Sequence, residues 1–187
     1  MRLFLDTEYH GGRRAQRLLS VGLVAEDGRW FYGELPQELA RVTDHDDFFA
    51  THVTPQFARV PGAAHGDPAA LAAALWSFVA ALVGPTPAEG AAESTAAVGP
   101  LRLACDDRHD RLLIDRLWCL ATPAPAPWSH EDVRGLVNGP ADRAGLIAQG
   151  ALARRFGLRA HHALADAESL ATAAARQGSV PNRGDVG

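Results

Sequence analysis

The chain contains no lysine and only two cysteines, and none of its hydrophobic runs reaches the length of a membrane-spanning helix. Cys105 and Cys119 lie within apolar segments, which predicts buried, reduced thiols and argues against a disulfide framework or a thiolate zinc site. The amino terminus also lacks the basic region, apolar core and small-residue cleavage site of a secretory signal. We therefore expect a cytoplasmic protein without a membrane partner.

An excess of positive charge is also missing, because the formal net charge is -4 at pH 7. Nonspecific coating of nucleic acid relies on counterion release by a basic surface, so this balance argues against that class of protein but leaves an enzyme open. All 18 basic residues are arginine, which together with the abundant alanine and glycine is typical of a GC-rich genome. The planar guanidinium still suits phosphate recognition.

The 187 residues, of which 47% are hydrophobic and 21% charged, fit one globular domain without an internal repeat. We place this domain at residues 1–178 and expect a disordered tail at 179–187. Residues 85–100 are small, bounded by proline and without periodicity, which predicts a flexible insertion loop.

The order of expected elements indicates an α/β domain, with a mixed sheet, an early antiparallel meander and flanking helices. Residues 2–8 read as a strand, and residues 17–35 as two further strands joined at Asp27-Gly28, a strong hairpin signal. A buried helix is expected over residues 67–84, where the Ala and Trp stripe fits core packing. The remaining expected elements are a strand at 101–107 and helices at 108–121, 140–156 and 164–178.

Two carboxylates interrupt the apolar first strand, whose sequence is RLFLDTE. Side chains alternate along a strand, so Asp6 and Glu8 point to one face and Thr7 points to the other, away from the acids. Burying two like charges on one face is costly unless something neutralises them. This cost makes the pair a candidate cation site.

Further acids stand where apolar periodicity predicts a partly buried helix face. Asp110 precedes Leu113 and Ile114 by three and four residues and so shares their side of the first helical turn. Asp166 lies in the first turns of the last helix, five residues after His161.

Each of these assignments has a rival in the sequence. Asp106 and Asp107 stand beside Asp110, and either fits a plain helix cap. His162 adjoins His161 and is otherwise read as a solvated polar residue, while Glu168 is expected on an exposed helix face.

Two other groups near the strands have both a functional and a structural interpretation. Arg13, Arg14 and Arg17 could guide a phosphate backbone or simply form a solvated hairpin. The aromatic run from Trp30 to Tyr32 could stack on bases, but a β run of this kind is more often core, and we assign no site to it.

The five residues Asp6, Glu8, Asp110, His161 and Asp166 resemble the pattern of the DEDDh family of 3′-to-5′ exonucleases, which have the RNase H-like fold. The segments FLDTEY, LLSVGLVAEDGRWFY and HHALADA resemble more closely the actinobacterial exoribonucleases related to RNase AS. The resemblance covers nearly the whole chain. Two departures are the absence of the Asn-bearing form of the middle motif, and His162 where close relatives often carry Asn, a change expected to alter substrate contacts.

The resemblance implies four metal ligands for two Mg²⁺ ions, with Mn²⁺ as a substitute. Asp6 would be shared by both ions, Glu8 and Asp166 would bind the ion that holds the attacking water, and Asp110 would bind the second ion, directly or through water. Hard divalent cations prefer such carboxylate oxygens.

The resemblance further assigns His161 as the general base, since an imidazole titrates near neutral pH. Thr7, Glu8 and His161 would contact the terminal nucleotide, Thr7 through its backbone. The implied function is hydrolysis of single-stranded RNA from its 3′ end to nucleoside 5′-monophosphates, including adenylate-rich tails, by a homodimer. A 3′-to-5′ DNA exonuclease and an inactive nucleic-acid-binding module are the alternatives.

Overall fold

The computed structural model describes residues 1–11, 16–42, 47–84 and 101–178. Arg13, Arg14, the expected loop at 85–100 and the expected tail at 179–187 lie outside these ranges. The strands are β1 (Arg2–His10), β2 (Arg17–Ala25), β3 (Trp30–Glu34), β4 (Ala64–His65), β5 (Leu101–Cys105) and β6 (Trp128–Asp132). The helices are α1 (Pro36–Leu39), α2 (Pro68–Val83), α3 (Arg108–Ala121), α4 (Pro140–Gln149), α5 (Ala151–Phe156) and α6 (Ala163–Gly178), with short turns η1 (Phe49–Val53) and η2 (Thr54–Gln56) after α1.

The described strands form one mixed sheet in the order β4-β3-β2-β1-β5-β6. The first three strands are the predicted antiparallel meander, while β5 and β6 extend the sheet on the other side of β1 as parallel strands. The expected α/β class with a mixed sheet and an early meander is therefore confirmed.

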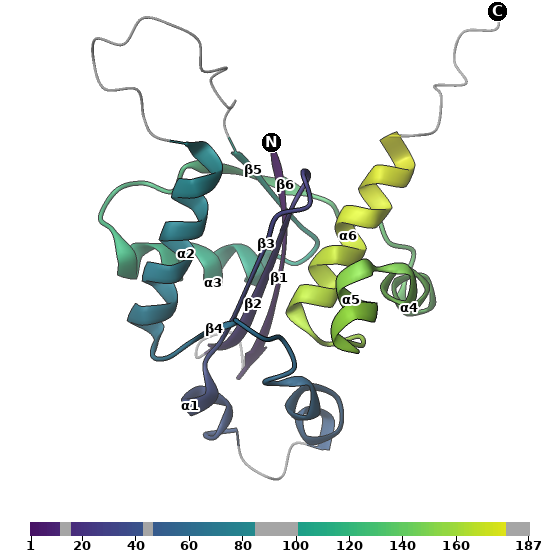
Figure 1. The fold of residues 1–187 in the computed structure, drawn as a ribbon, viewed down its shortest axis with the longest axis horizontal. Helices are drawn as coiled ribbons and strands as arrows, with labels where there is room; N and C mark the ends of the chain where they lie inside the picture. Colours follow the sequence, from purple (N-terminus) through teal and green to yellow (C-terminus); the bar gives the residue numbers. More distant parts are fainter. Residues whose placement is uncertain (12–15, 43–46, 85–100, 179–187) are drawn as a thin grey trace, which may run out of the picture.

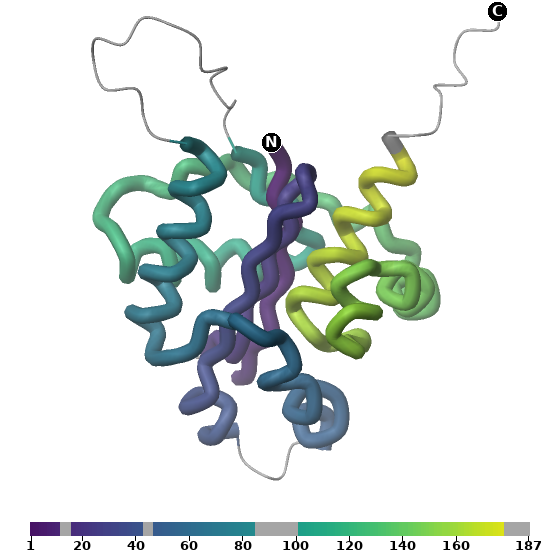
Figure 2. Tube along the Cα trace, viewed as in Figure 1, coloured from purple at the N-terminus to yellow at the C-terminus, as the bar shows by residue number. Residues whose placement is uncertain are grey.

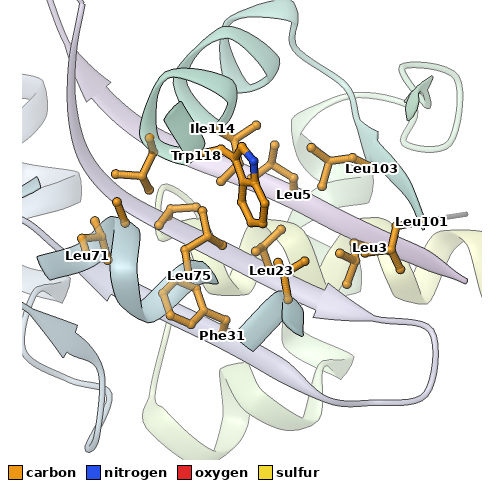
Figure 3. Close-up of a cluster of buried hydrophobic side chains, with 14 of the residues drawn as sticks. Leu3, Leu5, Leu23, Phe31, Leu71, Leu75, Leu101, Leu103, Ile114 and Trp118 are labelled. Atoms are coloured by element: carbon orange, nitrogen blue, oxygen red, sulfur yellow. The ribbon is translucent and has the colours of Figure 1, made fainter. Parts of the chain in front are cut away.

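Helices cover both faces of the sheet, with α2 and α3 on one side and α4, α5 and α6 on the other (Figures 1 and 2). Side chains of β1 point alternately to the two helical layers. Leu3 and Leu5 pack into the cluster formed with α2 and α3 (Figure 3), whereas Phe4 packs with Leu170 of α6. Asp6 and Glu8 follow Phe4 on the α6 face, so the alternation predicted from sequence is correct for the two acids.

Several expectations about burial are wrong. Trp76 is 47% exposed, because the buried face of α2 is formed by Leu71, Leu75 and Val79 instead. Cys105 is buried in β5 as predicted, but Cys119 is exposed on the outer side of α3. Phe31 and Tyr32 are core residues, which agrees with the structural interpretation of the aromatic run.

The helix expected over residues 140–156 is interrupted at Gly150, which separates α4 from α5. A Cβ atom added at Gly150 would lie 2.3 Å from Glu168 Oε2. Glu168 is buried, contrary to the prediction, because its carboxylate accepts hydrogen bonds from the N–H groups of Leu152 and Ala153. Among the helices in the described ranges, none combines the length and hydrophobicity needed to cross a bilayer.

Candidate active site

The predicted residues Asp6, Glu8, His161 and Asp166 line a pocket of about 470 Å³ at one end of the strands, and Asp110 is grouped with Asp6 beside it. Its walls come from β1, the end of β5, the start of α4 and the turn before α6. The lining residues are Asp6, Thr7, Glu8, Asp106, Val137, Gly139, Pro140, Arg143, Ala160, His161 and Asp166.

The parallel pairing of β1 with β5 brings two acids to this end of the sheet. Phe4 pairs with Ala104, so Asp6, still within β1, and Asp106, just past the end of β5, come beside one another two residues further on. Asp107 then caps α3 by accepting a hydrogen bond from the His109 N–H. Asp110 lies in the first turn of the helix that this cap begins, as its periodicity predicted.

The last helix approaches β1 closely because β2 carries a glycine opposite Asp6. Gly22 pairs with Asp6, and a Cβ atom at Gly22 would lie 2.4 Å from the backbone of Ala163 and Leu164. Any other residue at this position would push the start of α6 away from the sheet. The glycine thereby places Asp166 over the acids of β1.

The acids form two groups that share one member. Ligand atoms of Asp6, Glu8 and Asp166 all lie within 4.8 Å of one another, and so do those of Asp6, Asp106 and Asp110. The structure therefore brings all four predicted acids together. It adds Asp106, which the sequence analysis left as a possible cap.

Asp110 has one satisfied and one unsatisfied carboxylate oxygen. Thr7 Oγ1 donates a hydrogen bond of 2.6 Å to Asp110 Oδ1, whereas the buried Oδ2 has no hydrogen-bond partner within the described ranges. The prediction that Thr7 points away from the acids is wrong for Asp110, because α3 packs on the face of β1 that Thr7 occupies. A buried carboxylate oxygen without a donor is suited to bind a cation.

Asp166 also shapes the turn that carries the predicted base. Its Oδ2 accepts hydrogen bonds from the N–H groups of His161 and His162, at 2.9 and 3.2 Å. His161 has φ = 65°, a left-handed conformation that is unusual for a residue with a Cβ atom. This conformation leaves the His161 side chain exposed at the pocket wall.

A buried glutamine fixes the same turn from the other side. Gln56 Nε2 donates to the carbonyls of Ala160 and His161, at 2.9 and 3.2 Å, and Gln56 Oε1 accepts from the Arg159 N–H. The His161 ring meets Phe48 edge to face, with centroids 4.8 Å apart. A single glutamine between prolines and aromatics gave no signal of this role in the sequence.

His162, the rival of His161, is not a pocket residue. Its ring is buried and stacks on Tyr32 with centroids 4.5 Å apart, and burial lowers its pKa to about 4. The expectation of a solvated residue is wrong for His162. Its expected effect on substrate contacts stays a prediction, which a buried ring would exert indirectly.

Among the residues that the structure describes, Arg143 of α4 is a cation that faces the acids. Its Nη1 lies 3.2 Å from Asp166 Oδ1 and 3.8 Å from Asp6 Oδ1, and its Nη2 contacts Asp106 Oδ2. The sequence analysis missed this residue. Arg17, by contrast, pairs with Glu38 at 3.5 Å.

Burial of Asp6, Glu8, Asp110 and Asp166 close to one another favours their protonated forms. Burial and then the neighbouring carboxylates raise the pKa of Glu8 to about 8 and that of Asp6 well above its usual value. Burial raises the pKa of Asp110 to about 7 even though the Thr7 hydrogen bond lowers it. The pKa of Asp166 is also raised by burial, against the opposing effect of Arg143.

The arrangement can hold divalent cations. The donors are all carboxylate oxygens, which suits a hard cation, and the unpartnered oxygen of Asp110 is one that a cation would satisfy. Comparison with protein-family models and with curated proteins found no match to this chain.

Proposed function

We propose that the protein is a two-metal-ion 3′-to-5′ exonuclease that acts on single-stranded RNA and releases nucleoside 5′-monophosphates. The observation that carries this proposal is the pair of carboxylate groups that share Asp6, each with ligand atoms within 4.8 Å. Two-metal phosphodiester hydrolysis uses cations about 3.5–4 Å apart, and a carboxylate common to both groups would hold two cations that close together.

The residues divide between the two ions as their grouping suggests. Asp6, Glu8 and Asp166 would hold one ion, and Asp6 with Asp110 and Asp106 would hold the other. Mn²⁺ would substitute for Mg²⁺, because the ligand oxygens are the same for both. When bound, such ions lower the pKa of water and stabilise negative charge on a leaving oxygen.

His161 is the proposed general base. Its ring lies at the wall of the same pocket as Asp6, Glu8 and Asp166, where it can take a proton from a water that attacks the terminal phosphate. The bonds from Asp166 and Gln56 to its backbone hold the turn from both sides. Thr7 and Glu8 line the pocket and would contact the terminal nucleotide.

The fold supports the RNase H-like assignment without establishing it. An antiparallel meander extended past its first strand by parallel strands, with helices on both faces, is the arrangement that this assignment requires. The preference for RNA, the adenylate-rich substrates and the homodimer rest on the resemblance of FLDTEY and HHALADA to the exoribonucleases related to RNase AS.

Digestion of 3′- and 5′-end-labelled homopolymer RNAs tests the reaction, its direction, its base preference and its metal requirement together. We expect release of 3′-terminal monophosphates with Mg²⁺ or Mn²⁺ and none with chelator. Asp6→Asn and His161→Ala should each fold and lose at least about 100-fold in rate, since a positioned base alone contributes about 10²–10⁴-fold. Unchanged release by either variant would refute the role given to that residue.

The two alternatives have distinct outcomes in the same assay. Faster digestion of a matched DNA oligomer would favour a DNA-directed exonuclease. Tight RNA binding without hydrolysis in Mg²⁺ or Mn²⁺ would favour a binding module that has lost turnover. The presence of Asp6, Glu8, His161 and Asp166 in one pocket, with Asp110 grouped beside Asp6, argues against it.

A further inference from the structure

Arg143 links the two groups of acids through one guanidinium. Nη1 donates to Asp166 Oδ1 in the first group, and Nη2 donates to Asp106 Oδ2 in the second. Asp6, the member common to both groups, lies 3.8 Å from Nη1. The positive charge thus faces oxygens from both places in which the proposed function requires a divalent cation.

Arg143 and bound cations would compete for these oxygens. A carboxylate oxygen that accepts a guanidinium hydrogen bond at 3.2 Å has one lone pair directed at nitrogen and is less available to a metal ion. Like charges a few ångströms apart in a partly buried pocket also repel strongly. Binding of divalent cations therefore favours a conformation in which the guanidinium has left the acids.

The surroundings of Arg143 allow its side chain to move while its backbone stays in place. The backbone N–H of Arg143 donates to the Gly139 carbonyl at 3.1 Å, and the Asp142 carboxylate accepts from the backbone N–H of Asn138. The start of α4 is therefore fixed by bonds that do not involve the guanidinium. The side chain borders the open pocket of about 470 Å³. A rotamer of Arg143 directed into this pocket would release the carboxylates without moving the start of α4.

We propose that Arg143 is a displaceable counter-ion of the active site. It neutralises Asp6, Asp106 and Asp166 when no divalent cation is bound, and it leaves them when the metal ions bind. This inference rests on the proposed function, because it assumes that the acids hold divalent cations. In the metal-free protein, the Arg143 guanidinium then supplies the positive charge that bound cations supply in the metal-loaded protein.

The test is calorimetric titration of Mn²⁺ into the full chain, without substrate, for wild type, Arg143→Met and Arg134→Met. The last variant removes the same charge from the exposed pair between Arg134 and Asp132 and so serves as the control. We expect Arg143→Met to bind Mn²⁺ at least about tenfold more tightly, or about 1.4 kcal/mol, and Arg134→Met to match wild type. Arg143→Met should also melt at a lower temperature in chelator and regain more stability from Mn²⁺ than wild type does.

The outcomes separate this inference from the proposed function. If wild type binds Mn²⁺ and Arg143→Met binds it equally or more weakly, displacement is wrong while the metal site stands. If no protein binds Mn²⁺, the metal site and the displacement both fall.

A measurement on wild type covers the case in which Arg143→Met does not fold. The guanidinium ¹⁵N resonances of Arg143 should shift on addition of Mg²⁺, while those of Arg134 stay unchanged. Resonances of Arg143 that do not respond to a saturating amount of Mg²⁺ would overturn the displacement.

Discussion

The two oxygens of the Asp110 carboxylate have different surroundings, and this difference makes a single hydroxyl important. Thr7 satisfies Oδ1 from the neighbouring strand, which leaves Oδ2 as the oxygen without a donor. The hydroxyl also opposes the effect of burial on the Asp110 pKa. Thr7 therefore helps to keep Asp110 ionised and oriented for a cation.

We predict that Thr7→Val weakens Mn²⁺ binding about tenfold with little change in the fold. Valine keeps the shape of threonine, but loss of a hydrogen bond to a charged group costs about 1.5–3 kcal/mol. The measurement is calorimetric titration at pH 7. Thr172→Val is the matched control, because its hydroxyl donates to the Glu168 carbonyl away from the pocket. Equal weakening in both variants would contradict a specific role for Thr7.

The residues that sequence reasoning found are those whose position follows from a local rule. Alternation placed Asp6 and Glu8 on one face, and helical spacing placed Asp110 in the first turn of α3. Arg143 obeys no such rule, since its hydrogen-bonded partners lie 23 and 37 residues away, on α6 and at the end of β5. Asp106 became distinguishable from Asp107 only through the register of β1 with β5.

At the scale of elements, η2 fixes the turn that carries His161. Gln56 is buried, and its amide bonds to Arg159, Ala160 and His161 hold three consecutive backbone positions. The acids depend on other elements, namely β1, α3 and α6. Asp166 links the two, because this proposed metal ligand accepts the His161 N–H, while Gln56 holds the same turn through its carbonyls and the Arg159 N–H.

We predict that Gln56→Leu lowers kcat at least about tenfold and leaves Mn²⁺ affinity unchanged. Leucine fills the space but leaves buried backbone groups without partners, which costs about 1–3 kcal/mol of stability, and the released turn lets His161 leave its position. The measurements are single-turnover RNA hydrolysis at saturating Mg²⁺ and Mn²⁺ calorimetry. Gln149→Leu, which loses only an exposed contact with Arg176, is the control. A parallel loss of Mn²⁺ affinity would mean that Gln56 also positions Asp166, through the turn to which both residues bond.

The division of residues 140–156 into α4 and α5 could not be predicted from local periodicity. The apolar pattern runs through Gly150, so periodicity predicts one helix. The break depends on a carboxylate from α6, which occupies the space beside Gly150 and binds the first N–H groups of α5. By contrast, the meander was predictable because Asp27-Gly28 specifies a local turn.

At the scale of the whole molecule, the pocket brings together acids from both ends of the described chain. The repulsion and burial of these carboxylates lower the stability of the folded state. Asp6 and Glu8 come from the first strand and Asp166 from the last helix. Burial raises the pKa values of these groups in the native state. At a pH between the pKa values of the unfolded and the native state, the native state therefore keeps protons that the unfolded chain has released. Without metal, stability should fall as pH rises through that window.

We predict this fall between about pH 4.5, the ordinary pKa of Glu8, and about pH 8, its raised value in the pocket. Below this window Glu8 is protonated in both states and the destabilisation vanishes; above it the full effect is present. Urea unfolding in chelator at pH 5, 6, 7 and 8 measures it. Glu8→Gln should flatten the dependence, whereas Glu26→Gln, at the exposed turn between β2 and β3, should not.

Divalent cations should reverse the sign of this effect. A bound cation stabilises the ionised carboxylates, so the gain in unfolding free energy on adding Mg²⁺ should grow from pH 5 to pH 8 as fewer protons have to be released. In wild type the stability curves with Mg²⁺ and with chelator should therefore diverge as pH rises. In Glu8→Gln they should diverge less, because one ligand no longer titrates. Curves that coincide in wild type would mean that Mg²⁺ does not stabilise the native state, and the pocket would then not be a metal site. A constant offset would mean that Mg²⁺ binds without displacing protons from these acids.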